Sequence, residues 1–349
     1  MIGYLAAIWG CAFVATLLLT RGVLRYAVAQ ALLDLPNERS LHSRPTPRGG
    51  GLAIVLVVLG GFAMLAAAGV IDQATGVALV GGGSLVAAVG WMDDRKGVST
   101  RLRLTFHLLA AIWSVIWLHG MPSLAIGATS VYLGVAGAVI AILAIVWTTN
   151  FYNFMDGIDG LAAGEAASVG LGAAGLLTPR SPALAAATAI VAGAAAGFLP
   201  WNWERARIFM GDVGSGFLGF TFATLALASE NAGTMPSLVW LLLTAVFFAD
   251  ATITLFRRIL RREPWYAAHR SHAYQRAVHA GWPHGRVTMV VLVLNLGLAL
   301  LARLAARSPE ALPRVLLVVS VLMVALYVAV ERWSPMSLSR ATAMEKPAP

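Results

Sequence analysis

Residues 131–149 read VYLGVAGAVIAILAIVWTT, and no charged side chain interrupts them. A transmembrane helix needs about 20 apolar residues to cross the hydrocarbon core of a bilayer, so this stretch predicts a membrane span. The next residues, 150–160, read NFYNFMDGIDG and are rich in amide and carboxylate groups. The sequence therefore places a polar motif directly at the end of a membrane helix, and this arrangement recurs along the chain.

The composition of the whole chain agrees with this interpretation. Of 349 residues, 59% are hydrophobic and only 12% are charged, and the mean hydropathy is +0.77. A soluble domain contains about 25% charged residues. So few charges cannot cover a water-facing surface, which excludes a soluble enzyme, a disordered chain and a fibrous protein. The single cysteine, Cys11, lies in an apolar run, so we expect neither a disulfide framework nor a cysteine metal site.

Eleven apolar runs are candidates for membrane spans, so we predict an all-α, polytopic membrane protein with about eleven transmembrane helices. The runs cover residues 2–22, 49–69, 74–92, 104–120, 131–149, 161–178, 183–200, 215–229, 236–256, 287–305 and 312–331. We expect residues 1–333 to form a single transmembrane domain with a cytoplasmic lid at 257–286. The polar tail, 334–349, is expected to be a disordered cytoplasmic segment.

Basic residues are concentrated in alternate loops. The chain has 25 Lys and Arg against 16 Asp and Glu, and most of the basic residues lie in or beside 23–48, 93–103, 150–160, 201–214 and 257–286. Short loops rich in Lys and Arg stay in the cytoplasm, which predicts a periplasmic N-terminus and a cytoplasmic C-terminus. The first apolar run has no small-residue cleavage site, so we expect a retained helix. Nucleic-acid binding would need a soluble basic face, and we expect no nucleic-acid partner.

The acidic residues are not explained by topology. Carboxylates contribute little to membrane orientation and are costly near hydrocarbon. Five of them nevertheless fall at the expected cytoplasmic ends of helices: Asp93, Asp94, Asp156, Asp159 and Asp212. Their gathering on one membrane face indicates a functional site.

The first polar segment combines DLPNERS at 34–40 with HSRPTPRGGG at 42–51. Prolines and glycines fix an irregular backbone at the mouth of a helix, where exposed N–H groups suit an anion. Arg44 and Arg48 add guanidinium groups that favour phosphate or pyrophosphate. The alternative is a basic loop that only contacts the membrane surface.

The second segment, WMDDRK at 91–96, contains the adjacent carboxylates of Asp93 and Asp94. Like charges repel, so such a pair rarely stabilises a fold. It suits a divalent cation, or a shared proton that lets one carboxylate act as a base. The alternative is a solvated helix end paired with its own arginines, which include Arg101 and Arg103.

The third segment repeats polar side chains every three residues, at Asn150, Asn153, Asp156 and Asp159. On a helix end this spacing places them on one face. Amide and carboxylate oxygens are ligands for Mg²⁺ and partners for sugar or nucleotide hydroxyls. An EF-hand is excluded because its glycine would be misplaced and position 167 is Ala where the loop needs a closing Glu.

The fourth segment, RIFMGDVGSGFLG at 207–219, contains Asp212 on a glycine hinge. Within it GSGFLG matches the dinucleotide fingerprint, but no strand precedes it and a membrane helix follows, so we reject that match. A carboxylate at the start of a helix remains a reasonable position for a metal or a phosphate.

The fifth segment lies in the expected lid and contains His269, Arg270 and His272. Two histidines at this spacing could bind zinc, but the segment supplies no third ligand. Imidazole and guanidinium groups together suit a diphosphate better. Asp250 lies inside an expected span, where it could either pair with an arginine or line a cavity.

These segments, in this order, resemble the polyprenyl-phosphate N-acetylhexosamine-1-phosphate transferases. That family includes the bacterial enzymes that start O-antigen, enterobacterial common antigen and teichoic acid synthesis, and the translocase that makes lipid I. The resemblance covers about residues 34–276 and rests on D-x-P-N-x-R-S-x-H with P-T-P-R-G-G-G, the Asp93–Asp94 pair, N-x-x-N-x-x-D-G-x-D-G, and F-M-G-D-x-G-S. Each motif is weak alone, whereas four in sequence are specific.

The resemblance implies a reaction at the inner, cytoplasmic membrane of a bacterium, in an active site that faces the cytoplasm. Polyprenyl phosphate, typically undecaprenyl phosphate, attacks the β-phosphorus of a UDP-amino sugar, and UMP leaves. The chemistry moves phosphoryl charge, so it needs Mg²⁺, or Mn²⁺ in its place, and cationic side chains. The expected partners are therefore the UDP-sugar, the lipid phosphate and the bilayer, and a homodimer is one further option.

The resemblance also implies roles for particular residues. Asp212 is expected to be the main Mg²⁺ ligand, with Asn153 and Asp156 as metal or nucleotide ligands. Asp93 is the expected base for the lipid phosphate, with Asp94 as its catalytic neighbour. The residues expected to bind substrate are Arg44, Arg48, Asn150, Asn153, Asp156, Asp159, His269, Arg270 and His272.

One departure from the family bears on the donor. The lipid I translocase carries two or three adjacent histidines, whereas here His269 and His272 are separated by Arg270 and Ser271. This spaced form resembles the O-antigen-initiating branch, whose donors are UDP-GlcNAc or 6-deoxy amino sugars such as UDP-FucNAc and UDP-QuiNAc. The translocase reaction remains an alternative.

Two other classes fit less well. CDP-alcohol phosphotransferases carry D-G-x-x-A-R and further spaced aspartates, whereas Asp159 is followed by GLAAG. A membrane cation transporter should hold its acids near the bilayer midplane, often in broken helices of two related halves. Here the acids lie at one expected face, and the sequence shows no two halves.

Overall fold

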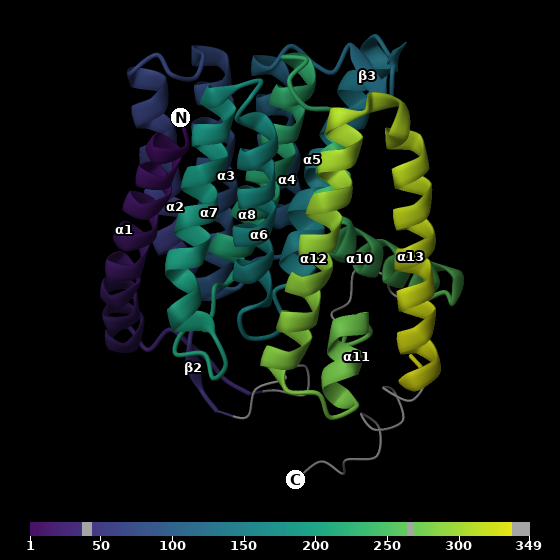
Figure 1. Ribbon diagram of the computed structural model, residues 1–349. Coiled ribbons are helices and arrows are strands. Elements are labelled where there is room, and N and C mark those ends of the chain that lie inside the picture. Colours follow the sequence, from purple (N-terminus) through teal and green to yellow (C-terminus); the bar gives the residue numbers. More distant parts are fainter. Residues whose placement is uncertain (37–43, 264–268, 337–349) are drawn as a thin grey trace.

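The computed structural model describes residues 1–36, 44–263 and 269–336, and long helices form a bundle (Figure 1). The helices are α1 (Ile2–Ala29), α2 (Gly51–Ala67), α3 (Gln73–Lys96), α4 (Thr100–Trp117), α5 (Val135–Phe154), α6 (Leu161–Leu177), α7 (Pro182–Asn202), α8 (Asp212–Asn231), α9 (Ser237–Leu243), α10 (Ala245–Leu260), α11 (Ala273–His279), α12 (His284–Arg307) and α13 (Leu312–Trp333), with the 3-10 turn η1 (Pro309–Ala311).

Each of the eleven expected runs contains a helix or, at 236–256, a pair of helices. Among the described residues, seven helices are long and apolar enough to cross a membrane, or eight if the bent pair counts as one span. Helices α2 and α6 have 17 residues each and are shorter than a typical span. The helical, multi-pass architecture is confirmed, whereas the number of eleven spans stays a prediction.

The run at 236–256 does not form one straight helix. Helices α9 and α10 meet at Thr244 and are bent by 84°. The hydroxyl of Thr244 donates to the carbonyl of Trp240 at 3.0 Å, a local bond that competes with the regular helical ladder. As a result, α10 lies across the bundle near α11 (Figure 1).

Two small antiparallel sheets interrupt the helical pattern. Strand β1 (Leu33–Asp34) pairs with β2 (Thr46–Pro47), and β3 (Ser123–Ile126) pairs with β4 (Thr129–Tyr132). The β3–β4 hairpin lies at the end of the bundle opposite β2 and α11 (Figure 1). The N-terminus and the last turn of α13 also lie at opposite ends, as expected, but which end faces the cytoplasm stays a prediction.

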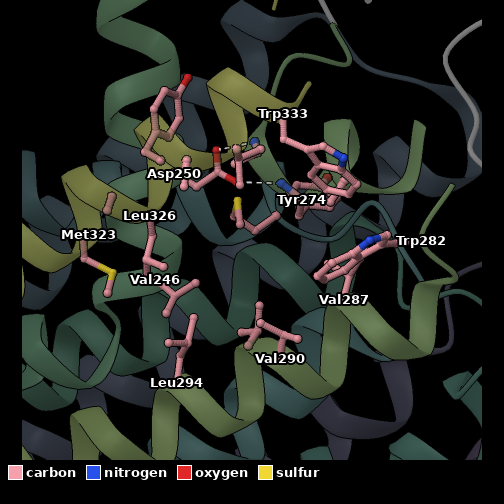
Figure 2. A pocket seen from close by; sticks show the side chains of 18 residues that line it. Val246, Asp250, Tyr274, Trp282, Val287, Val290, Leu294, Met323, Leu326 and Trp333 are labelled. Atoms are coloured by element: carbon pink, nitrogen blue, oxygen red, sulfur yellow. Dashed lines mark hydrogen bonds between the residues drawn. The ribbon is translucent and has the colours of Figure 1, made fainter. Parts of the chain in front are cut away.

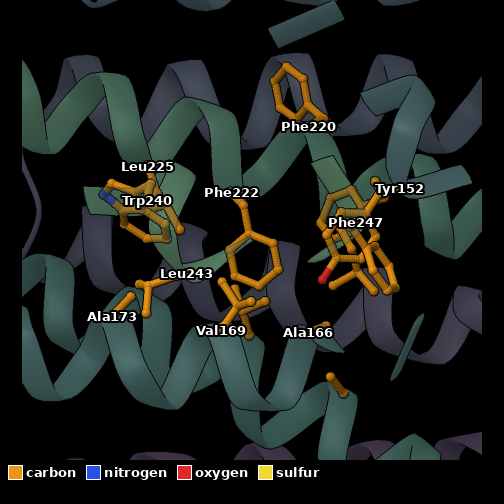
Figure 3. Close-up of a cluster of buried hydrophobic side chains, with 14 of the residues drawn as sticks. Tyr152, Ala166, Val169, Ala173, Phe220, Phe222, Leu225, Trp240, Leu243 and Phe247 are labelled. Atoms are coloured by element: carbon orange, nitrogen blue, oxygen red, sulfur yellow. The ribbon is translucent and has the colours of Figure 1, made fainter. Parts of the chain in front are cut away.

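Helix α8 lies at the centre of the bundle and is buried along most of its length. The ring of Tyr152 in α5 packs against those of Phe222 in α8 and Phe247 in α10, with 5.8 and 5.1 Å between the ring centroids. Figure 3 shows these rings beside small residues of α6 such as Ala166. These contacts hold the end of α5, with its polar motif, against the middle of α8 and against α10.

One polar contact crosses the apolar interior. The fully buried Glu165 of α6 accepts a hydrogen bond from Asn295 of α12 at 2.6 Å. The same amide nitrogen donates to Ser168 at 2.8 Å. This contact connects two helices that are far apart in sequence.

The expected lid at 257–286 contains the end of α10, all of α11 and the start of α12. Arg276 of α11 is fully buried and forms an ion pair with Glu331 of α13, which also binds Arg257 of α10 at 2.6 and 2.7 Å. Part of the expected lid, 264–268, and most of the expected tail, 337–349, lie outside the described residues. The role of this segment as a lid stays a prediction.

Close contact between α2 and α8 gives a first prediction. A Cβ atom on Gly51 would lie 2.4 Å from the Cα of Gly214, so Gly51→Ala should overpack the helix ends and cost about 1–3 kcal/mol of stability. Gly60→Ala is the control, because the same helix faces open space there. Thermal unfolding in detergent should show a lower midpoint for Gly51→Ala alone; equal midpoints would contradict the close contact.

Candidate active site

Four chain segments meet at the end of the bundle that carries β2. They are the end of α3, the first turn of α4, the start of α8, and residues 44–50 before α2. Side-chain hydrogen bonds among them connect Asp93, Asp94 and Asp212 with Arg48 and Arg103. The structure therefore brings the three residues expected to be catalytic into one network.

Asp94 is at the centre of this network. Its side chain is only 2% exposed, and Oδ1 accepts hydrogen bonds from Arg48 Nε at 3.1 Å and Nη2 at 2.6 Å. The same carboxylate accepts the backbone N–H groups of Asp212 at 3.0 Å and Val213 at 3.1 Å. It thus satisfies two N–H groups at the start of α8 and complements the helix dipole there.

The glycine hinge before α8 makes this contact possible. Gly211 has a φ of 77°, which favours glycine, and a Cβ atom at this position would lie 2.4 Å from Asp94 Oδ2. Gly90 has the same role on α3, because its Cβ would lie 2.6 Å from the carbonyl oxygen of Asp212. The glycines let α3 and the start of α8 approach closely enough for Asp94 to reach both N–H groups.

These contacts favour a positioning role for Asp94. Its carboxylate is buried and already accepts from two backbone groups and one guanidinium, so little of it faces a substrate. The expected assignment of Asp94 as a catalytic residue stays a prediction.

Arg103 connects the other two carboxylates. Its Nη1 atom donates to Asp93 Oδ2 at 2.7 Å and to Asp212 Oδ2 at 2.8 Å. Asp93 also accepts the backbone N–H of Val98 at 2.7 Å. Arg103 was expected only as a possible partner of its own helix end, and its bridge to Asp212 is a contact that the motif does not indicate.

The segment before α2 reaches the site through the backbone. The N–H groups of Gly50 and Gly51 donate to the carbonyls of Phe209 and Met210 at 2.9 and 2.8 Å. These bonds place Arg48 beside Asp94, whereas Arg44 is exposed. Residues 37–43, which include the last four residues of DLPNERS and the first two of HSRPTPRGGG, lie outside the described residues.

The end of α5 contributes amide and carboxylate groups. Asn153 Nδ2 donates to Ser215 Oγ of α8 at 3.0 Å, whereas Asn150 donates to the carbonyl of Val146 in its own helix at 2.7 Å. The half-buried Asp156 carboxylate accepts no hydrogen bond from any residue that the structure describes. Burial raises the pKa of Asp156 well above its usual range, and the negative charge of Asp212 adds to this effect. A cation beside this group would stabilise its charged form.

Asp159 has different partners from those of the carboxylate network. Its Oδ2 accepts the backbone N–H of Ala206 at 3.1 Å and lies 3.5 Å from His284 Nδ1. Its carbonyl oxygen accepts from Thr288 at 3.0 Å. Asp159 therefore fixes the start of α12 against the loop before α8, and its expected contact with substrate stays a prediction.

The histidine motif is held by Asp250, whose role the sequence left open. The Asp250 carboxylate accepts the backbone N–H groups of Ala273 at 2.8 Å and Tyr274 at 3.2 Å, and it lies 3.4 Å from His272 Nδ1. Tyr274 in turn donates to the carbonyl of Phe154 at the end of α5, at 2.9 Å. These contacts connect the histidine motif to the polar end of α5.

His269 lies next to His272, with 4.9 Å between the ring centroids, and Arg270 follows it directly. Burial lowers the pKa of His269 to about 3, and the charges of His272 and Arg258 contribute to this shift. His269 is therefore neutral near pH 7. Its Nδ1 accepts the N–H of Ser271 at 3.3 Å, which leaves the proton on Nε2 as a hydrogen-bond donor.

The donor atoms of the site fit Mg²⁺ in chemistry, since carboxylate and amide oxygens are its preferred ligands. Asp212, Asn153 and Asp156 supply such oxygens, and the unpartnered carboxylate of Asp156 is free to bind a cation. Among the described residues, no three acidic, histidine or cysteine side chains already converge on one point. Arg103 instead lies between Asp93 and Asp212.

Carboxylates, amides and guanidiniums gather at one end of a helical membrane bundle. This arrangement is typical of membrane-embedded enzymes that bind charged substrates. Residues 76–230 match the model of glycosyl transferase family 4. A Mycobacterium tuberculosis protein named decaprenyl-phosphate N-acetylglucosaminephosphotransferase is 30% identical over 73% of this chain and 71% of its own. The chain therefore belongs to glycosyl transferase family 4, the family of membrane transferases that includes this relative.

Two further relatives cover a larger share of the chain. A probable undecaprenyl-phosphate N-acetylglucosaminyl 1-phosphate transferase from Bacillus subtilis is 28% identical over 80% of this chain and 78% of its own. A phospho-N-acetylmuramoyl-pentapeptide-transferase from a Picosynechococcus species is 30% identical over 80% of this chain and 79% of its own. The resemblance that the motifs indicated is confirmed at the level of the family.

The Asp94 network gives a second prediction. In Asp94→Asn the amide nitrogen cannot accept an N–H, so Arg48 or the start of α8 loses an acceptor. Breaking a buried ion pair costs about 3–5 kcal/mol, and thermal unfolding should show a clearly lower midpoint. Asp72→Asn is the control, because Asp72 caps the opposite end of α3 at the surface and Asn caps equally well. Similar midpoints for the two variants would contradict the role assigned to Asp94.

Proposed function

We propose that this protein transfers an N-acetylamino-sugar 1-phosphate from a UDP-sugar to polyprenyl phosphate, releasing UMP. The observation that carries the proposal is the convergence of Asp93, Asp94 and Asp212 with Arg48 and Arg103 at one end of a membrane bundle. The guanidiniums of such a site can bind phosphate oxygens and its carboxylates can hold a divalent cation, so the site suits two phosphate-bearing substrates next to a bilayer, where a lipid-linked acceptor resides.

The names of the relatives support this reaction. Two of them act on undecaprenyl or decaprenyl phosphate with N-acetylglucosamine, and one transfers phospho-N-acetylmuramoyl-pentapeptide. We propose UDP-GlcNAc or a 6-deoxy amino sugar such as UDP-FucNAc or UDP-QuiNAc as the donor, because His269 and His272 are spaced apart. The product would start O-antigen or a related cell-envelope polysaccharide.

The proposed reaction forms one phosphorus–oxygen bond and breaks another. An oxygen of the lipid phosphate bonds to the β-phosphorus of the donor, and the bond from that phosphorus to the bridging oxygen breaks, so UMP carries away the electron pair. Asp93 would accept a proton from the lipid phosphate. Arg48, His269, Arg270 and His272 would bind phosphate oxygens, with His269 donating from its neutral ring.

The proposal includes a divalent cation, Mg²⁺ or Mn²⁺, held by Asp212, Asn153 and Asp156. When bound, it would neutralise charge on the transferred phosphoryl group. Asp94 would keep the start of α8, and so Asp212, in place for this purpose through its two backbone hydrogen bonds.

An apolar cavity supports a lipid acceptor. A cavity of about 430 Å³ lies between α10, α11, α12 and α13 and is lined almost entirely by apolar side chains, with Asp250 and Tyr274 also among the lining residues (Figure 2). Met155 also lines it, directly before Asp156 in the chain. We propose that this cavity takes part of the polyprenyl chain while its phosphate reaches the carboxylates.

The proposed location is the inner membrane, with the site facing the cytoplasm. The end of the bundle that carries the site also carries α11 and the basic residues that predict cytoplasmic loops. A soluble UDP-sugar would reach the site from this side.

The lipid I-type translocase reaction is the second candidate, because a relative with that name covers most of the chain. A cation transporter is disfavoured, because the carboxylates meet at one end of the bundle and three of them are already paired with arginines. Cysteine accessibility from both membrane faces would indicate a transporter, whereas access from one face fits a transferase.

The function is tested with purified protein, polyprenyl phosphate, Mg²⁺ and a panel of UDP-sugars that includes UDP-MurNAc-pentapeptide. We expect UMP release and a polyprenyl-diphosphate product with UDP-GlcNAc or a 6-deoxy amino sugar. EDTA should stop turnover, and added Mg²⁺ should restore it. No product with any donor would refute the proposal, and turnover in EDTA would refute the metal.

The roles of two carboxylates give a further prediction. Asp93→Asn removes the proposed base and should lower the rate of UMP release by about 10²–10⁴-fold. Asp212→Asn weakens the proposed metal site and should be at least as severe, with part of the loss recovered at high Mg²⁺. Asp72→Asn again serves as the control. Near-normal activity in either variant would overturn the role assigned to it.

A further inference from the structure

The two carboxylates that the proposed reaction needs most are both bound by one side chain. Arg103 Nη1 lies 2.7 Å from Asp93 Oδ2 and 2.8 Å from Asp212 Oδ2. Two carboxylates that bind the same nitrogen atom lie close enough to repel each other, and the guanidinium between them offsets the repulsion. Arg103 therefore occupies a cation position between a proposed base and a proposed metal ligand.

The carboxylates of this bridge are more exposed than the carboxylate of the neighbouring Arg48–Asp94 ion pair. The side chains of Arg103, Asp93 and Asp212 are 24%, 12% and 22% exposed, whereas that of Asp94 is 2% exposed. Asp94 also accepts two backbone N–H groups, whereas the Asp212 carboxylate accepts a hydrogen bond from the Arg103 guanidinium. Ions can reach the Arg103 bridge, and breaking it leaves the start of α8 capped by Asp94.

The charges of the site favour an exchange of cations. When ionised, Asp93, Asp94 and Asp212 carry three negative charges against the two positive charges of Arg48 and Arg103. This excess of negative charge favours a further cation, and oxygen ligands suit Mg²⁺.

We propose that Arg103 is a displaceable counter-ion: it holds Asp93 and Asp212 together until a divalent cation binds, and then turns to the phosphate oxygens of the donor. This inference rests on the proposed function and assigns a further residue to it. Arg103 lies in the first turn of α4, where its long side chain can reach outward.

The test compares Arg103→Gln with Arg101→Gln, an exposed position in the same helical turn. Binding of Mn²⁺ is measured by electron paramagnetic resonance without any substrate. Loss of the competing charge should tighten Mn²⁺ binding about fivefold or more in Arg103→Gln and leave Arg101→Gln unchanged. Unchanged or weaker binding in Arg103→Gln would overturn the inference.

Thermal unfolding separates the exchange from a purely structural role. In EDTA, Arg103→Gln should unfold at a lower temperature than the wild type, because Asp93 and Asp212 then repel. Saturating Mg²⁺ should remove this difference. A deficit that persists in Mg²⁺ would show that Arg103 only supports the fold.

A measurement on the wild-type protein needs no variant. Arginine modification by phenylglyoxal, read by mass spectrometry, should increase at Arg103 when Mg²⁺ is added and decrease when UMP is added with Mg²⁺. No increase with Mg²⁺ would overturn the exchange. Neither the Mn²⁺ titration nor the phenylglyoxal modification in Mg²⁺ needs a sugar donor. Failure of the donor panel would therefore refute the proposed function, while these two measurements would still test the role of Arg103.

Discussion

The carboxylate of Asp94 is the contact on which the arrangement of the site depends. It holds Arg48, which precedes α2, and two backbone N–H groups at the start of α8, although these groups are 46, 118 and 119 residues away in sequence. Without it, the first turn of α8 would expose unsatisfied donors in a buried place, which is costly. The position of Asp212, and through Arg103 that of Asp93, follows from this one group.

The same physical solution occurs a second time at Asp250. There a buried carboxylate accepts two N–H groups at the start of α11 and lies beside His272. In both places an acid fixes a helix start and a cationic or ionisable partner, while more exposed groups remain available for chemistry. The bend at Thr244 belongs to this arrangement, since it directs α10 and its Asp250 toward α11.

Much of this organisation was predictable because it is local. Apolar runs such as 131–149 became helices, and motifs at their ends supplied Asp93 and Asp212, which the structure brings together. The bend at Thr244 was not predictable, because the run at 236–256 contains neither an internal proline nor glycine to mark it. The partners of Asp159 and the bridge by Arg103 depend on contacts across long stretches of chain, and a basic residue in a cytoplasmic loop already has a topological explanation.

The buried contact between Glu165 and Asn295 has a consequence for biogenesis. Helix α6 has 17 residues and carries a carboxyl group in its interior, so its partition into lipid as an isolated segment is unfavourable. Its hydrogen-bond partner is synthesised 130 residues later. During translation, the carboxyl group of α6 therefore lacks this partner until α12 has been synthesised. We expect the final integration of α6 at the translocon to be late and cooperative with that of α12.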